Sequence, residues 1–255
     1  MRDISNTQVT MWQRCPRQYE FRYVRGIKIP PKGVMIQGSA YHGALKANFE
    51  SKIKTKEDLN SGDLLDAYDT SWNDRVTGDA IADDGEVIPG FAGIDWEQKD
   101  PGKLKDEGAV LLSLYHRQMA SSVIPINVEK KSGERIDADV RFIGFPDVET
   151  ENEIIDHKLR SASLSQDMAD RDFQPFSYLW LRKKRLFVYH VAVKKKIPEI
   201  QVVKVQKTVQ DINWWIDAVR QVAAQIRTGI APPRSDGWHC SERFCGYWKL
   251  CRGKV

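Results

Sequence analysis

The chain has 255 residues and a formal net charge of +4, and 41% of its residues are hydrophobic, 29% charged and 10% aromatic. This is the composition of a globular protein, and it excludes a disordered, collagen-like or coiled-coil chain. No apolar run reaches the roughly 20 residues of a membrane-spanning helix, and the first residues lack the apolar stretch of a secretory signal. We therefore expect a cytoplasmic protein without membrane contact, whose four cysteines stay reduced and act as metal ligands or free thiols.

The charge is distributed unevenly along the chain. Residues 181–207 carry nine Lys or Arg and one acid, residues 1–32 carry seven and two, and residues 51–108 carry seven basic and fifteen acidic side chains. This pattern predicts one face that binds a polyanion and one solvated acidic face, although two solvated faces would explain it equally well. The basic positions 182–185 and 194–196, with aromatic residues nearby, are the expected groove for DNA phosphates and stacked bases.

The first half of the chain is predicted to be mainly helical. Helices are expected over residues 5–25, 38–54, 60–77 and 103–121. Ser5 or Asn6 is the expected N-cap of the first helix, and Pro30 and Pro31 separate it from the second because proline fits neither a helix interior nor a central strand. Residues 77–93 are predicted to form a loop.

The pattern changes near residue 123 to short β-branched runs separated by turn signals. Strands are predicted within residues 123–131, 134–149, 152–159, 186–193 and 200–207. A helix is expected over 172–184, and a second one over 209–228 begins at a capping box formed by Thr208 and Asp211. Helices followed by a mixed sheet with an inserted helix indicate an α/β core that carries a helical insertion.

The strongest chemical signal is a set of three polar residues on two of these strands. Asp147 ends one strand, and Asp156 and Lys158 lie on the next, where residues two apart face the same side. Two carboxylates suit a hard cation such as Mg²⁺ or Mn²⁺, and an ammonium beside them would orient water or stabilise the charge on a phosphate. An ordinary salt bridge between strands is the alternative interpretation.

The arrangement of Pro146-Asp147 followed by Asp156-His157-Lys158 resembles the PD-(D/E)XK nuclease superfamily. Two further motifs resemble its RecB-like branch, which includes CRISPR-associated RecB-type and phage exonucleases: Gly38-Ser39-Ala40-Tyr41-His42 and Gln174-Pro175-Phe176-Ser177-Tyr178. The resemblance implies a restriction-endonuclease-like mixed sheet flanked by helices. It also implies that His42 and the backbone carbonyl of His157 are metal ligands, and that Gln174 and Tyr178 contact the scissile phosphate and the lysine.

One residue departs from the commoner family pattern. Asp156 stands where many relatives have glutamate, which changes the geometry of the site and not its chemistry. Glu129, on an earlier predicted strand, is a further carboxylate that we leave outside the predicted site.

The four cysteines are arranged as one plus three. Cys15 precedes a proline near the N-terminus, and Cys240, Cys245 and Cys251 follow as C-x4-C-x5-C in an aromatic-rich tail. Because no pair of CxxC knuckles is present, a 4Fe–4S cluster fits better than a zinc ribbon, with zinc or unligated thiols as alternatives. The RecB-like branch has a similar arrangement but commonly begins its C-terminal set with C-x2-C, so the wider first gap is a departure.

These features predict four consecutive segments: an N-terminal segment with one cluster cysteine (1–36), a helical region with the metal-binding histidine (37–122), the nuclease core (123–207), and a C-terminal helix with a cluster tail that joins the termini (208–255).

The expected function is that of a metal-dependent DNA exonuclease acting on single-stranded ends, and the resemblance favours 5′ to 3′ polarity. The alternative is a catalytically silent DNA-end-binding subunit of a recombination or CRISPR adaptation complex. An iron–sulfur redox protein is a third reading, but no motif resembles a flavin, nicotinamide or ferredoxin site.

Overall fold

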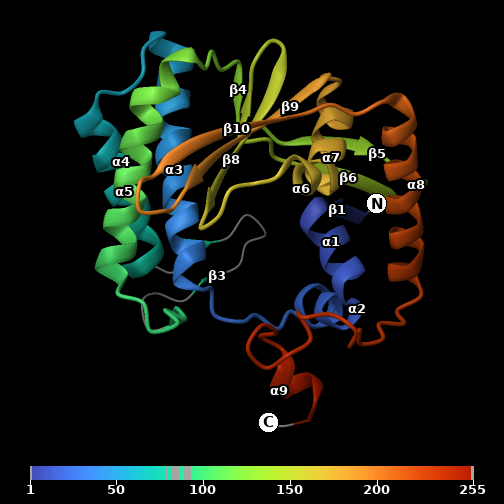
Figure 1. Cartoon of the computed structure of the whole chain (residues 1–255). Coiled ribbons are helices and arrows are strands. Elements are labelled where there is room, and N and C mark those ends of the chain that lie inside the picture. Colours follow the sequence, from blue (N-terminus) through green and yellow to red (C-terminus); the bar gives the residue numbers. More distant parts are fainter. Residues whose placement is uncertain (1, 78–79, 82–86, 89–92, 254–255) are drawn as a thin grey trace. The chain divides into compact units, whose positions relative to one another are not determined.

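The computed structural model describes residues 2–77, 80–81, 87–88 and 93–253, and Figure 1 shows its elements. The chain forms two compact units, one made of residues 1–29, 132–144 and 207–255 and the other of residues 30–131 and 145–206. Most of the loop expected over 77–93 lies outside the described residues, and within it the short strands β2 (Ala80–Ile81) and β3 (Val87–Ile88) pair antiparallel.

The second unit contains a mixed sheet of five strands in the order β10-β9-β8-β7-β4. Its strands are β4 (Asn127–Val128), β7 (Val148–Glu149), β8 (Glu153–Arg160), β9 (Leu186–Val193) and β10 (Glu199–Val205). β8 and β9 are parallel and the other neighbouring pairs are antiparallel. The expected mixed sheet flanked by helices is thus confirmed.

Helices cover both faces of this sheet (Figure 1). The helices on the sheet are α3 (Gly33–Thr55), α5 (Pro101–Gln118), α6 (Gln166–Arg171) and α7 (Phe173–Arg182). α4 (Ser61–Thr77) packs against α3 and α5, and the 3-10 turn Ala120–Ser122 follows α5. Successive residues of β8 face opposite sides, and His157 contacts Phe49 of α3 and Tyr115 of α5, whereas Asp156 contacts Gln174 of α7. β8 therefore presents polar side chains to helices on both faces.

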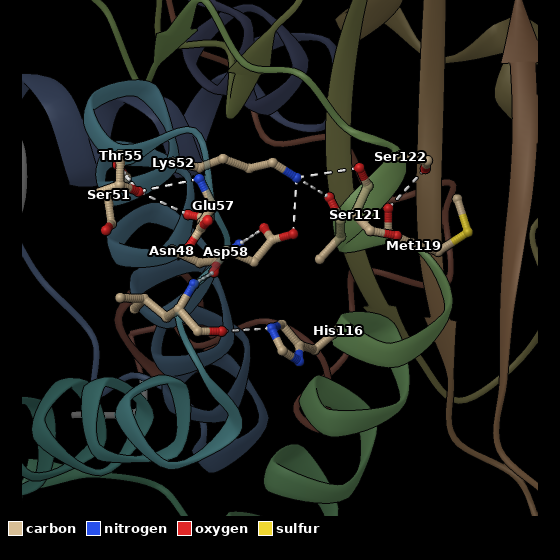
Figure 2. A network of polar contacts seen from close by, with 12 residues as sticks. Asn48, Ser51, Lys52, Thr55, Glu57, Asp58, His116, Met119, Ser121 and Ser122 are labelled. Atoms are coloured by element: carbon tan, nitrogen blue, oxygen red, sulfur yellow. Dashed lines mark hydrogen bonds and ion pairs between the residues drawn. The ribbon is translucent and has the colours of Figure 1, made fainter.

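A buried lysine fixes the C-terminal end of α3 (Figure 2). The ammonium of Lys52 lies 2.8 Å from Oδ2 of Asp58 and donates to the carbonyl of Ala120 at 2.7 Å. Asn48 donates to the same carboxylate at 2.8 Å and accepts from the backbone N–H of Leu59. These contacts join α3 to the turn that follows it and to the segment that follows α5.

The first unit is built around a three-stranded sheet in the order β1-β6-β5. Its elements are β1 (Arg2–Ser5), α1 (Asn6–Arg14), α2 (Pro16–Tyr19), a π-helical turn (Glu20–Val24), β5 (Ser132–Arg135), β6 (Val140–Gly144), α8 (Val209–Arg227) and α9 (Trp248–Cys251). β1 pairs parallel with β6, and the indole of Trp12 on α1 donates to Gln225 on α8 at 2.9 Å. The predicted capping box of Thr208 and Asp211 begins α8.

Two predicted elements differ from the structure. The helix expected over 5–25 starts after β1, with Ser5 as its N-cap, and is interrupted at Cys15, which is extended because it precedes Pro16. The strand expected over 134–149 is divided among the end of β5, β6 and β7, and the break before β7 contains Pro146, which has no N–H to donate to a sheet. As a result, residues 132–144, which the sequence assigned to the core segment, belong to the first unit.

None of the helices in the described part of the chain is long and apolar enough to span a bilayer.

Candidate functional site

Three predicted site residues are joined by direct contacts in the second unit. Nζ of Lys158 lies 2.7 Å from Oδ2 of Asp156, because both residues face the same side of β8. Gln174 bridges them from the first turn of α7: its amide oxygen accepts from Lys158 at 2.9 Å and its amide nitrogen donates to Oδ1 of Asp156 at 2.5 Å. The N-cap Asp172, which accepts from the backbone N–H of Gln174, sets where α7 begins.

Asp147 and His42 form the other half of the site. Asp147 directly precedes β7, and its Oδ2 accepts from the backbone N–H of His157 on the neighbouring β8 at 2.8 Å. His42, on α3, brings Nδ1 to 3.2 Å from the same oxygen.

The electrostatics separate the roles of the two carboxylates. Burial opposes ionisation of Asp147, but His42 and His157 outweigh it and hold the pKa of Asp147 well below its usual range. Burial raises the pKa of Asp156 to about 7; Lys158 opposes this shift and Asp147 adds to it. Burial alone would lower the pKa values of Lys158 and His42, but the neighbouring carboxylates raise both. The site thus holds a firmly ionised Asp147, a charged lysine and an easily protonated Asp156.

Tyr178, the other predicted residue of this helix motif, lies one turn after Gln174 on α7 and is hydrogen-bonded to it. Its hydroxyl donates to the carbonyl of Phe145 at 3.1 Å instead of contacting Lys158. Tyr178 therefore fixes the segment directly before Asp147, and only Gln174 of the helix motif touches the lysine.

Glu129 lies closer to the site than the sequence indicated. It lines a small cavity of about 10 Å³ together with His42 and Asp147, and it pairs with Lys46 of α3 at 2.6 Å. Residue spacing alone could not place it there, because Glu129 follows β4 with a left-handed backbone, φ 43°.

The donor set fits a hard divalent cation, although its side chains are paired with one another. In the described part of the chain, no three His, Cys, Asp or Glu side chains are spaced as a ready-made metal site. At the candidate site, His42 and Asp147 contact each other directly, whereas a cation would have to lie between them. Among the described residues, the four cysteines likewise are not spaced as a ready-made metal site. Oδ2 of Asp156 is buried and pairs with the ammonium of Lys158, and a carboxylate oxygen is the kind of ligand that Mg²⁺ and Mn²⁺ prefer.

The four cysteines line one cavity in the first unit, with a volume of about 220 Å³. Burial raises the pKa of the Cys251 thiol, and the nearby Cys15 and Cys245 raise it further. All four are free thiols, and Cys15 and Cys245 are buried. Four thiols are the ligand number of an iron–sulfur cluster, whereas a single zinc ion would need all four sulfurs within about 2.3 Å of it.

Two residues of this cavity were not identified from the sequence. Gln18 is buried and donates to Sγ of Cys245 at 3.2 Å. Nε2 of His239 is buried and has no hydrogen-bond partner among the described residues. His239 adjoins Cys240 in the sequence, and that adjacency is the signal that could have identified it.

Several cations of the expected DNA groove are paired within the protein. Arg182 and Lys184 both pair with Glu149, Lys195 pairs with Glu199, and Lys194 donates to Gln37. Burial also lowers the pKa of Lys194. The positive charge of this region is therefore smaller than the sequence suggests, and the groove stays a prediction.

Comparisons with known proteins agree with this architecture. The model of the PD-(D/E)XK nuclease superfamily matches residues 3–252. The crystal structure of a candidate exonuclease from Eubacterium rectale aligns with 94% of this chain and 86% of its own, with 12% identity and a TM-score of 0.52, and thus shares the fold. The crystal structure of SSO0001 aligns with 99% of this chain and 87% of its own, with 12% identity and a TM-score of 0.46. No curated protein matches the chain.

Proposed function

We propose that this chain, which belongs to the PD-(D/E)XK nuclease superfamily, is a metal-dependent DNA exonuclease of the RecB-like iron–sulfur branch. The observation that carries the proposal is the meeting of an ionised Asp147, His42, Asp156 and Lys158 around β7 and β8. These are the groups that cleavage of a phosphodiester with a bound cation requires.

In this proposal, His42, Asp147, Asp156 and the backbone carbonyl of His157 hold Mg²⁺ or Mn²⁺. The bound cation would lower the pKa of a coordinated water and neutralise negative charge on the phosphate. Lys158 stays protonated because two carboxylates raise its pKa, so it supplies a fixed positive charge beside the phosphate. Gln174 keeps the ammonium in place, and Asp156 would have to release its proton to act as a ligand of the cation.

The substrate is proposed to be DNA, mainly single-stranded ends, digested from 5′ to 3′ in the cytoplasm. The family membership supports DNA as the substrate class, and the resemblance of the sequence motifs supports the finer preferences. Recombination or CRISPR adaptation proteins are the proposed partners.

The second candidate is a catalytically silent module that only binds DNA ends. Such a module would not need a lysine that is held in place by both Asp156 and Gln174. This contact set favours the enzyme.

The cysteine cavity is proposed to hold a 4Fe–4S cluster bound by Cys15, Cys240, Cys245 and Cys251. Support comes from the four thiols around one cavity of about 220 Å³, which is larger than a single zinc ion needs. The cluster would join the first and last segments of the first unit.

Digestion of end-labelled single-stranded oligonucleotides tests the proposed function. Cleavage should require Mn²⁺ or Mg²⁺, stop in chelator, and be lost in Asp147→Asn and Lys158→Ala, while both variants still bind DNA. Labels at the two ends report polarity. Cleavage that continues in chelator would contradict the proposed mechanism, and DNA binding by a wild-type protein that never cleaves would support the silent module.

A further inference from the structure

A buried polar chain lies behind the proposed metal site, on the opposite face of the sheet from Lys158. The hydroxyl of Tyr115, on α5, lies 2.9 Å from Nε2 of His157 and 2.9 Å from Nδ1 of His190. His157 and His190 are register partners on the parallel strands β8 and β9, so both imidazoles face α5. Nδ1 of His157 points back to Asp147, 3.6 Å from its Oδ2.

These groups are buried and contact one another. All three side chains are almost fully excluded from solvent, and Phe49 stacks on the ring of His157. Burial raises the pKa of Tyr115 well above its usual value, and burial together with the neighbouring His157 lowers the pKa of His190 to about 3. Hydrogen bonds between neutral groups therefore decide how the rings are oriented.

Once Nδ1 of His157 carries a proton, the donor and acceptor roles in the other contacts follow. A carboxylate near Nδ1 of His157 favours the tautomer that carries its proton on that nitrogen. Nε2 of His157 is then an acceptor, so Tyr115 must donate to it. The hydroxyl has no second proton, and Nδ1 of His190 must therefore donate to the oxygen of Tyr115.

We propose that Tyr115 and His190 are positioning residues for the metal site, which hold the imidazole of His157 with its Nδ1–H towards Asp147. This inference rests on the proposed function. Oδ2 of Asp147 then faces the backbone N–H and the imidazole of His157 as well as the imidazole of His42. These contacts fix the orientation of the carboxylate before a cation binds. Partners of this kind, one step removed from the metal, typically change its affinity by about 10–100-fold.

The test is Mn²⁺ affinity of the full chain, measured without DNA from the electron paramagnetic resonance signal of free Mn²⁺. Tyr115→Phe should weaken binding about tenfold. Tyr41→Phe is the matched control, because Tyr41 is equally buried, its ring lies 6.5 Å from that of Tyr115, and its hydroxyl has no hydrogen-bond partner among the described residues. It should leave the affinity within about twofold of that of the wild type.

The same Tyr115→Phe substitution in a His157→Asn variant distinguishes a positioning role of Tyr115 from a role in packing alone. In His157→Asn, the amide N–H can donate to Asp147 without help from Tyr115, so adding Tyr115→Phe should no longer change Mn²⁺ affinity. An equal loss in both backgrounds, or no loss in either, would overturn the proposal.

If Tyr115→Phe does not fold, two variants of His190 test the proposal instead. His190→Leu removes the donor to Tyr115 and should weaken Mn²⁺ binding, whereas His190→Asn can keep a donor and should restore it; equal affinities would overturn the proposal. A wild-type chain that binds no Mn²⁺ and cuts no DNA would instead contradict the proposed function itself.

Discussion

The amide oxygen of Gln174 accepts a hydrogen bond of 2.9 Å from the ammonium of Lys158. Since the amide nitrogen of the same side chain donates to Asp156, the orientation of the amide is fixed by both neighbours. The first turn of α7 thereby places the lysine and the carboxylate relative to each other before any substrate binds.

Removing this bridge should impair catalysis more than stability. Gln174→Ala should lower kcat about 100-fold, because small misplacements of a catalytic group have effects of that size. The measurement is single-turnover cleavage of a labelled oligonucleotide at saturating Mn²⁺, with Gln166→Ala on the exposed face of α6 as the control. A variant of Gln174 as fast as the wild type would show that Lys158 needs no such support.

The part of the site that follows from local periodicity could be predicted. Asp156 and Lys158 share a face of β8 because residues two apart on a strand must, and Gln174 reaches them from the start of a helix. An i, i+4 spacing placed Tyr178 on the same helix face but could not show that its hydroxyl would bind the carbonyl of Phe145.

Contacts between distant segments could not be predicted from one sequence. Tyr115 and His190 are 75 positions apart, and nothing local indicates that α5 crosses β9 at that point. The pairing of β1 with β6 is of the same kind: the sequence predicted a helix from residue 5 and no strand before it, and a parallel partner more than 130 residues away makes residues 2–5 a strand.

Metal affinity should fall as the pH is lowered through 7. Asp156 must ionise to bind a cation, and burial raises its pKa to about 7, so below pH 7 a proton has to leave Asp156 when a cation binds. Between pH 8 and pH 6 the ionised fraction of such a group falls about tenfold, and Mn²⁺ affinity should fall at least as much because the pKa of His42 is also raised. Titration of Mn²⁺ at both pH values checks this, and an unchanged affinity would show that Asp156 is not a ligand.

Lys52 should be a stabilising residue without a catalytic role. Lys52→Met leaves the carboxylate of Asp58 and the carbonyl of Ala120 without their shared donor (Figure 2), which should lower the free energy of unfolding by about 2–3 kcal/mol. Lys54→Met, on an exposed position of the same helix, should change it by less than about 0.5 kcal/mol. Urea unfolding measures the difference. Mn²⁺ affinity of the folded protein should be the same in both variants.

Substitutions in the cysteine cavity and in the metal site should have separate effects, because the two lie in different units of the chain. Cys15→Ala or Cys245→Ala should remove the brown absorbance of an iron–sulfur cluster and lower the melting temperature. By analogy with a disulfide that closes a long loop, the link between such distant cysteines is worth roughly 5 kcal/mol. Asp147→Ala and Lys158→Ala should retain iron and the fold while abolishing cleavage. Both sets of variants are checked by the iron content, visible absorbance and melting temperature of protein purified without oxygen.

Three outcomes would contradict this division. Stoichiometric zinc without iron in the anaerobic protein would replace the cluster with a zinc site, for which the buried Nε2 of His239 is a further ligand at the same cavity. Full cleavage by Lys158→Ala would show that the lysine takes no part in catalysis. A normal iron content with a lower melting temperature in Cys245→Ala would mean that this thiol only packs, since Gln18 donates to its sulfur and Cys245 is buried whether or not iron is bound. The expected loss of iron from both cysteine variants, together with its retention in Asp147→Ala, follows only if the four thiols hold one cluster apart from the site of cleavage.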